Sequence, residues 1–246
     1  MNPTERFTER AGDYAAARPS YPDAAIDALF EGIAEPSQCA VVDLGAGTGI
    51  SSRLLAARGA HVIAVEPNAA MAAQGTYLAN LRLHAATAER TGLAGASADL
   101  VTAFQAFHWF DRSAAIAEML RLLRPGGRAA VVYNERDERD PFTAAYGNIV
   151  RRYATDDTER LRSNARDAFE RDRAWGSIRI VDAEHAHRLD RAGLHARASS
   201  ASYLPHENAS ARALHADLDT LFDRYANNAV VFMRMLATIS IATPPS

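Results

Sequence analysis

Three alternating glycines form the clearest pattern in the sequence that could bind a ligand. Gly45, Gly47 and Gly49 directly follow the apolar run 40–44, and apolar residues at helical spacing come next. Glycine lets the backbone turn sharply and lets a ligand touch the main chain with no Cβ atom in the way. Between a strand and a helix, such a turn is typical of a nucleotide-type site. A dinucleotide fingerprint would place its third glycine at position 50, which is Ile50, and this weighs against NAD.

Two carboxylates accompany the glycine turn. Asp43 stands just before it, where a carboxylate would repel a pyrophosphate but suits a ligand that carries an ammonium group. Glu66 comes 21 residues after Gly45, at the end of the next expected strand. An acid at that position can accept both hydroxyls of a ribose. Because NAD and adenosyl ligands both contain ribose, Glu66 predicts a ligand with a ribose and does not distinguish between these two ligand types.

Alternating strand and helix patterns must position these residues. We expect strands over Ala40–Leu44, His61–Val65, Leu81–Ala85, Asp99–Phe104 and Arg128–Tyr133, and helices over Asp23–Ile33, Ile50–Arg58, from Asn68 to about Asn80, and after Asp111. Strands and helices that alternate with short links predict an α/β fold with a doubly wound, mostly parallel sheet. The glycine turn and Glu66 would then meet at the carboxyl ends of neighbouring strands.

The pattern changes after residue 133. A charged helical stretch over 135–173 precedes an expected strand at 178–189, and a short helix that Asp190 could cap follows. A helix at 209–226 and an apolar, β-branched segment at 230–241 end the chain, and this segment is expected to return to the sheet as one of seven strands. We therefore expect a single domain over 1–246 that consists of an N-terminal lid (1–21), a core (22–133), a helical cap (134–175) and C-terminal strands and helices that complete the sheet (176–246).

The composition excludes several classes of protein. With 48% hydrophobic and 23% charged residues and a net charge of -3, the chain reads as an ordinary globular protein. A pI near 6.2 disfavours a nucleic-acid partner held by charge alone. All 27 basic residues are arginine, which removes any Schiff-base lysine or phosphate-loop lysine. The single cysteine, Cys39, excludes an internal disulfide and a thiolate metal cluster.

We expect a cytoplasmic protein. Residues 1–18 contain no apolar core of a secretory signal, and no apolar stretch approaches the length of a membrane span. We therefore expect no membrane partner.

Five segments, taken together, resemble the class I S-adenosylmethionine-dependent methyltransferases, in particular the type 11 family that acts on small molecules. In order, they are 43–49, 66–68 with Met71, 88–89 with Leu93, 105–110, and 122–127. The resemblance covers about 40–133. It implies a Rossmann-like methyltransferase fold, S-adenosylmethionine as cofactor, S-adenosylhomocysteine as product, and no metal.

The resemblance also implies where the cofactor lies. Glu66 would hold the ribose, the residues after it would flank the adenine, and Glu89 would face the adenine amino group. The segment 105–110 would lie beside the sulfonium. The expected cofactor-binding residues are Tyr14, Arg18, Asp43, Gly45, Ala46, Gly47, Thr48, Gly49, Glu66, Pro67, Met71, Ala88, Glu89, Gln105, Ala106, His108 and Trp109.

The N-terminal segment is expected to form a lid. Its pattern of Tyr14, Arg18 and Tyr21 around two prolines is similar to that of a subgroup that includes trans-aconitate methyltransferase-like proteins. Arg18 would pair with the cofactor carboxylate, and Tyr14 would cover the methyl group.

His108 is the candidate catalytic residue. A base is needed only where the acceptor loses a proton, and histidine is the side chain that titrates near neutral pH. The alternative is that His108 only forms part of the wall or contacts the cofactor.

The expected function is methyl transfer to a small-molecule acceptor, with O-methylation of a carboxylate or hydroxyl favoured and N- or C-methylation left open. The motif after strand four that is typical of nucleobase amino methylation is missing, and no His/Asp pair suits a magnesium-dependent reaction. The alternative is a protein that binds an adenosyl or dinucleotide cofactor without methyl transfer, either a regulatory binder or an NAD-type oxidoreductase. The protein would be a monomer or a homodimer.

Overall fold

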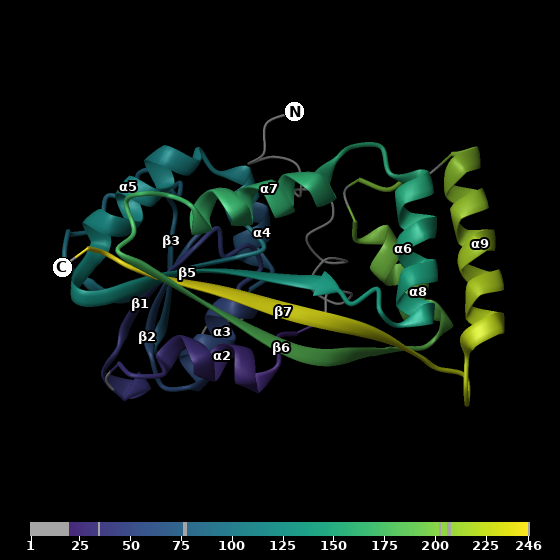
Figure 1. The fold of residues 1–246 in the computed structure, drawn as a ribbon, viewed down its shortest axis with the longest axis horizontal. Coiled ribbons are helices and arrows are strands. Elements are labelled where there is room, and N and C mark those ends of the chain that lie inside the picture. Colours follow the sequence, from purple (N-terminus) through teal and green to yellow (C-terminus); the bar gives the residue numbers. More distant parts are fainter. Residues whose placement is uncertain (1–19, 34, 76–77, 202, 206–207, 246) are drawn as a thin grey trace.

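The computed structural model describes residues 20–33, 35–75, 78–201, 203–205 and 208–245, and its centre is a seven-stranded sheet (Figure 1). The strand order is β3-β2-β1-β4-β5-β7-β6, and within the described residues β7 runs in the direction opposite to the other six strands. The predicted α/β fold with a doubly wound, mostly parallel seven-stranded sheet is confirmed. The strands are β1 (Ala40–Leu44), β2 (His61–Val65), β3 (Leu81–His84), β4 (Ala98–Phe104), β5 (Leu123–Arg136), β6 (Ser177–Leu189) and β7 (Val231–Thr243).

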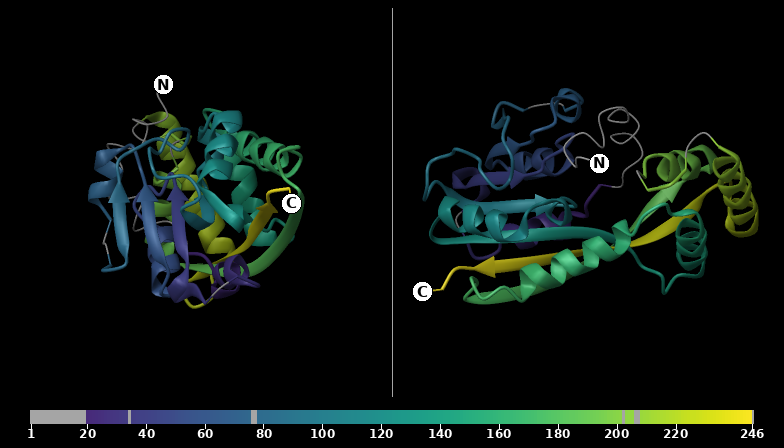
Figure 2. Two further views of the ribbon diagram at one scale, coloured as in Figure 1. Left: turned by 90° about the vertical axis from the view of Figure 1, so that its left-hand side faces the viewer. Right: turned by 90° about the horizontal axis from the view of Figure 1, so that it is seen from above.

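Helices cover both faces of the sheet, which is why its central strands are apolar on both sides. Val41 packs with helices α2 and α3 on one face, whereas its neighbour Val42 packs with α5 and α7 on the other. Figure 2 shows the two helical layers on either side of the strands. The helices are α2 (Asp23–Phe30), α3 (Ile50–Ala57), α4 (Ala69–Ala73), α5 (Arg112–Leu122), α6 (Pro141–Tyr153), α7 (Thr158–Glu170), α8 (Arg191–Ser199) and α9 (Ala209–Tyr225), with short 3-10 turns η2 (Pro36–Gln38) and η3 (Phe107–Trp109).

A third apolar cluster forms a cap at one end of the molecule. It contains α6, α8 and α9, which pack around the far ends of β6 and β7 (Figure 1). Met233 and Met235 of β7 belong to this cluster, whereas Ile239 and Ile241 of the same strand belong to the core beneath α2. One continuous strand therefore serves both cores.

Four elements differ most from the sequence expectations. Helix α2 ends at Phe30 instead of at Ile33. The helix that Asn68 caps ends at Ala73 instead of continuing to about Asn80. Strand β5 begins at Leu123, which pairs with Ala98 of β4, and it runs to Arg136, which pairs with Met235 of β7. Helix α7, expected in the cap, packs on the sheet through Ala165 and Phe169. The division of the chain into four parts stays a prediction.

Within the described ranges, we find no helix of the length and apolarity that crossing a bilayer requires.

Candidate active site

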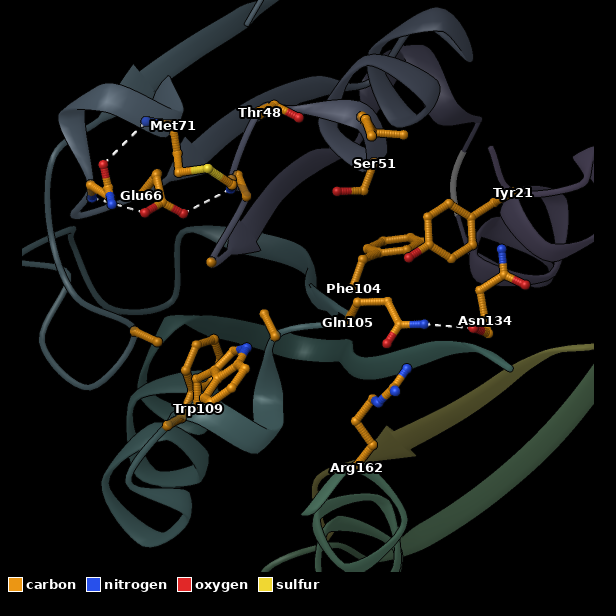
Figure 3. Close-up of a pocket in the computed structure, with 18 of the residues that line it drawn as sticks. Tyr21, Thr48, Ser51, Glu66, Met71, Phe104, Gln105, Trp109, Asn134 and Arg162 are labelled. Carbon is orange, nitrogen blue, oxygen red and sulfur yellow. Dashed lines mark hydrogen bonds between the residues drawn. The ribbon is translucent and has the colours of Figure 1, made fainter. Parts of the chain in front are cut away.

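The carboxyl ends of the parallel strands open into a cavity of about 360 Å³ (Figure 3). It lies where the strand order reverses between β1 and β4, the usual place for ligands in doubly wound sheets. Its walls come from the turns that follow β1, β2, β3 and β4, from the end of β5, and from α7, α8 and β7. Segments far apart in the sequence therefore share one cavity.

The glycine turn, residues 45–49, forms one wall through its main chain. Gly45, Gly47 and Gly49 all have positive φ angles, between 59° and 73°, which favour glycine. A Cβ atom at Gly45 would lie 2.7 Å from the Cβ atom of Ala106 and 3.0 Å from the Phe110 ring. The turn can pack this closely against the segment after β4 only because position 45 has no side chain.

Asp43 lies beneath the glycine turn and is fully buried. Its carboxylate accepts hydrogen bonds from three hydroxyls: Ser51 Oγ at 2.7 Å, Ser52 Oγ at 2.6 Å and Thr102 Oγ1 at 2.8 Å. Burial raises the pKa of Asp43, and the three donors oppose that shift. The side chain does not line the cavity. Through these bonds Asp43 fixes the start of α3 below β1, and its contact with a ligand ammonium group stays a prediction.

Glu66 links two parts of the cavity wall. Its Oε2 accepts a hydrogen bond from the Gly47 amide at 2.7 Å, and its Oε1 accepts one from the Asn68 amide at 2.8 Å. Asn68 in turn caps α4 by accepting from the amides of Ala70 and Met71. Burial raises the pKa of Glu66, against these two amides. The carboxylate lines the cavity (Figure 3), and each oxygen keeps a further lone pair for a ligand.

Thr48 carries a buried hydroxyl at the cavity. The residue is 1% exposed, and its Oγ1 has no hydrogen-bond partner among the residues that the structure describes. A buried hydroxyl without a partner costs about 1–3 kcal/mol, so a polar ligand at this wall would relieve that cost. The glycine turn, Glu66 and Thr48 together fit a ligand with several hydroxyl and charged groups.

The loop after β3 contributes Ala88 and Glu89 to the wall. Glu89 Oε1 accepts a hydrogen bond from the Asp111 amide at 3.0 Å, which ties this loop to the start of α5. Glu118 of α5 holds the same loop more firmly, because it accepts from both the amide and the hydroxyl of Thr91 and pairs with Arg121.

The segment after β4 divides its side chains between the cavity and the core. Gln105 has a φ of 50°, unusual for a residue other than glycine, and its Nε2 donates to the Asn134 carbonyl at 2.7 Å. Ala106 and Trp109 line the cavity, whereas Phe107 is fully buried and packs edge-to-face on Phe169 at 5.4 Å.

His108 is not among the residues that line the cavity. Its Nδ1 lies 3.4 Å from the hydroxyl of Tyr133, and its ring lies 4.5 Å from that of Trp109. Tyr133 of β5 is fully buried in the apolar cluster that contains α7, and burial raises the pKa of its hydroxyl. The geometry thus turns the candidate base toward Tyr133. Its catalytic role stays a prediction.

A second wall, which sequence reasoning missed, consists of long polar side chains at the other end of the cavity. Glu135 and Arg136 come from the end of β5. Nearby, the Tyr21 ring packs edge-to-face on the Phe104 ring, with 4.8 Å between the ring centroids. The interleaved Arg and Glu residues of 135–166 look like a solvated helical face, so the sequence offered no signal for them. We call the following group the arginine wall: Glu135, Arg136, Glu138, Glu159, Arg162, Arg197 and Tyr203.

Most of the residues expected to bind a cofactor line the cavity, although binding itself stays a prediction. Gly49 does not line it, and Tyr14 and Arg18, with the predicted lid contacts, lie outside the described residues. The expected residues that line it are Gly45, Ala46, Gly47, Thr48, Glu66, Pro67, Met71, Ala88, Glu89, Gln105, Ala106 and Trp109.

Comparison with known sequences gives a consistent result. Residues 42–131 match a family of methyltransferase domains. An uncharacterized methyltransferase from Mycobacterium tuberculosis is 42% identical over 151 residues, which is 59% of this chain and 59% of the relative. A methyltransferase-like protein from Schizosaccharomyces pombe is 33% identical over 152 residues, 61% of this chain and 59% of the relative. The chain therefore spans about three fifths of the length of these curated relatives.

Solved structures extend the likeness over most of the chain. A protein from Anaeromyxobacter dehalogenans, assigned as a type II methyltransferase, has a TM-score of 0.72 and 25% identity, and the match covers 92% of this chain and 96% of that one. An N-methyltransferase from Haemonchus contortus, solved with phosphomonomethylethanolamine and S-adenosylhomocysteine, has a TM-score of 0.55 and 14% identity. That match covers 99% of this chain and 58% of the other, and it concerns the fold alone.

Proposed function

We propose that the protein transfers a methyl group from S-adenosylmethionine to a small-molecule acceptor. Residues 42–131 match the methyltransferase-domain family, which is the type 11 family of class I methyltransferases. S-adenosylhomocysteine is the second product. O-methylation of a carboxylate or hydroxyl is the favoured reaction, and N- or C-methylation is possible. The acceptor is the expected partner, and the expected cytoplasmic location, monomeric or dimeric state and lack of a metal belong to the same proposal.

The observation that carries this proposal is the polar surface that the glycine turn and Glu66 form in the cavity, where the strand order reverses between β1 and β4. Glu66 is held by the Gly47 and Asn68 amides, and it can accept ribose hydroxyls through its remaining lone pairs. The buried hydroxyl of Thr48 adds a polar group on the same wall. These residues would hold the adenosyl and amino-acid parts of the cofactor.

When bound, S-adenosylmethionine supplies an activated methyl group on a sulfonium sulfur. The chain then has to orient the acceptor and exclude water, and orientation alone can lower a barrier by several kcal/mol, up to about 7–11 in model systems. Gln105, fixed by its bond to Asn134, and Trp109 border the space where the acceptor and cofactor would meet. Since His108 faces Tyr133, transfer by orientation to an ionised acceptor is the mechanism that these residues support best.

The alternative of a dinucleotide cofactor is not favoured. Ile50 occupies the position of the third fingerprint glycine and lines the cavity, so its branched side chain takes up space beside the helix start. A regulatory protein that binds S-adenosylmethionine without methyl transfer differs from the proposal only in activity.

Calorimetry tests the cofactor first. We expect S-adenosylhomocysteine to bind and NAD to bind at least about ten-fold more weakly, a difference of about 1.4 kcal/mol. Tighter binding of NAD would overturn the proposal. Release of S-adenosylhomocysteine in the presence of small-molecule acceptors then separates the enzyme from a regulatory binder.

A pair of matched threonine variants locates the binding surface. Thr48→Val removes a buried hydroxyl with no partner among the described residues. It should weaken S-adenosylhomocysteine binding by about 0.5–1.5 kcal/mol, and it should raise the unfolding free energy of the free protein because the cost of the unpaired hydroxyl is removed. Thr102→Val removes a hydroxyl that donates to Asp43, so it should lower the unfolding free energy instead. Equal affinity in wild type and Thr48→Val would show that this hydroxyl does not face the cofactor.

A further inference from the structure

We propose that the methyl acceptor carries an anionic group, most simply a carboxylate, that docks on Arg162. The inference rests on the proposed function and adds the chemical class of the substrate. Figure 3 shows the Arg162 side chain rising from α7 into the cavity, on the side away from Glu66. Helix α7 lies on the sheet through Ala165 and Phe169, so the position of this arginine is set by the core.

The acids of the arginine wall already have arginine partners. Glu135 accepts from Arg166 at 3.1 Å, and Glu138 accepts from Arg151 at 2.7 Å. Glu159 pairs with Arg136, whose side chain is only 12% exposed. These pairs neutralise the three carboxylates that face this end of the cavity.

Arg162 differs from those arginines. Among the residues that the structure describes, it makes no ion pair, and its polar contact is a long one, from Nη2 to the Tyr203 hydroxyl at 3.5 Å. Its Nε is buried and has no hydrogen-bond acceptor within the described ranges. The guanidinium lies 5.8 Å from the centroid of the Tyr203 ring, which supports the cation without neutralising it. A half-buried charge in this state favours an anion in the cavity.

The electrostatics of the cavity give the acceptor a direction. Glu66 and Glu89 lie at the end where the cofactor would bind, whereas Arg162 and Arg197 add positive charge at the other end. An acceptor with its carboxylate at Arg162 would extend its remaining atoms toward the glycine turn. Arginine recognises planar carboxylates through two parallel N–H donors, which fixes orientation as well as position.

The test uses the protein saturated with S-adenosylhomocysteine and small carboxylic acids paired with their primary amides. Probes are benzoate with benzamide, 4-hydroxybenzoate with 4-hydroxybenzamide, and crotonate with crotonamide, titrated by calorimetry. We expect at least one acid to bind about ten-fold tighter than its amide, the equivalent of one charge-assisted hydrogen bond. If every acid binds no better than its amide, the inference is wrong.

Variants of α7 assign the preference to one side chain. Arg162→Gln should abolish the preference for acid over amide, and Arg162→Lys should keep part of it, because the charge remains without the two-donor geometry. Arg160→Gln is the matched control: this arginine is on the same helix, is 73% exposed and pairs with Asp157. A preference that survives in Arg162→Gln, or is lost in Arg160→Gln, would overturn the inference.

The first titration separates the two levels of the argument. If S-adenosylhomocysteine does not bind to the wild type, the proposed function fails. If it binds equally to wild type and Arg162→Gln while no acid is preferred, only the present inference fails. Equal binding of S-adenosylhomocysteine by the two proteins also shows that the variant is folded.

Discussion

The two ends of the cavity are built from different material. The glycine turn and Glu66 form their wall from main-chain atoms and short side chains that lie within about twenty residues of sequence. The arginine wall combines long side chains from β5, α7 and α8, held by ion pairs. A wall of main-chain atoms keeps its shape when neighbouring side chains are substituted. The charge and hydrogen-bonding groups of a wall of long side chains change with each substitution. The first suits a ligand shared by a family, and the second suits the ligand that distinguishes its members.

The largest expected effect is at Gly45. Gly45→Ala would place a Cβ atom 2.7 Å from Ala106, at a φ of 66°, and should weaken S-adenosylhomocysteine binding by more than about 100-fold, or about 2.7 kcal/mol. Gly92→Ala is the control, because Gly92 has a φ of 72° with nothing within 4 Å of the added atom. Calorimetry on both variants separates steric contact from backbone strain. Equal, small losses in both would show that the close contact at Gly45 is unimportant.

The arginine wall should respond in stability, with cofactor affinity unchanged. Arg136→Gln removes the nearly buried arginine that pairs with both Glu159 and Glu138. It should lower the unfolding free energy by about 2 kcal/mol. Chemical denaturation measures this loss, and calorimetry should show the affinity for S-adenosylhomocysteine within about three-fold of wild type. A large loss of affinity would mean that the two walls are coupled and would break the comparison.

The contribution of Glu118, which holds the loop after β3, to the unfolding free energy should depend on pH. The hydrogen bonds from Arg121, and from Thr91, lower the pKa of Glu118 from 4.5 to about 2, so the folded state favours its ionised form. Its contribution to stability is present above pH 4.5 and is lost as the pH falls toward 2. Glu118→Gln should therefore lower the unfolding free energy at pH 7 by about 1–2 kcal/mol, and the difference from wild type should shrink below pH 4.5.

Glu184→Gln is the control for this measurement, because Glu184 and its partner Arg139 are each 70% exposed. Exposed pairs contribute about 0–1 kcal/mol. A pH-independent difference between Glu118→Gln and wild type would contradict the assignment.

The smallest effect is expected at His108, between the two walls. Since its imidazole faces Tyr133, His108→Ala should reduce turnover by less than about three-fold, far below the roughly 100-fold or more that a general base contributes. The pH-rate profile should stay flat from about pH 5.5 to 8.5 in both proteins. A wild-type profile that falls near pH 6–7 and flattens in the variant would restore His108 as a base.

The sequence was a good guide where the signal is local. Apolar runs located β1 and β2 to the residue, and the glycine pattern located the turn between β1 and α3. Local signals could not show that three hydroxyls enclose Asp43, because one of them belongs to Thr102 of β4, which lies 59 residues away. They failed at α7 as well, where two apolar residues in a charged helix decide that it packs on the sheet. That packing decides in turn that Arg162 faces the cavity.

The long strand β7 has a consequence for how the cavity could open. It pairs with β6 without interruption from Thr243 to Val231, and its residues enter both the core of the sheet and the cluster of the cap. Domain hinges are usually a few residues in loops or at the ends of elements. A swing of the cap about the sheet would instead bend a continuous ladder of hydrogen bonds in mid-strand. The continuous strand β7 therefore joins the cap stiffly to the sheet, and we expect ligands to exchange through movement of the shorter connecting segments around the cavity.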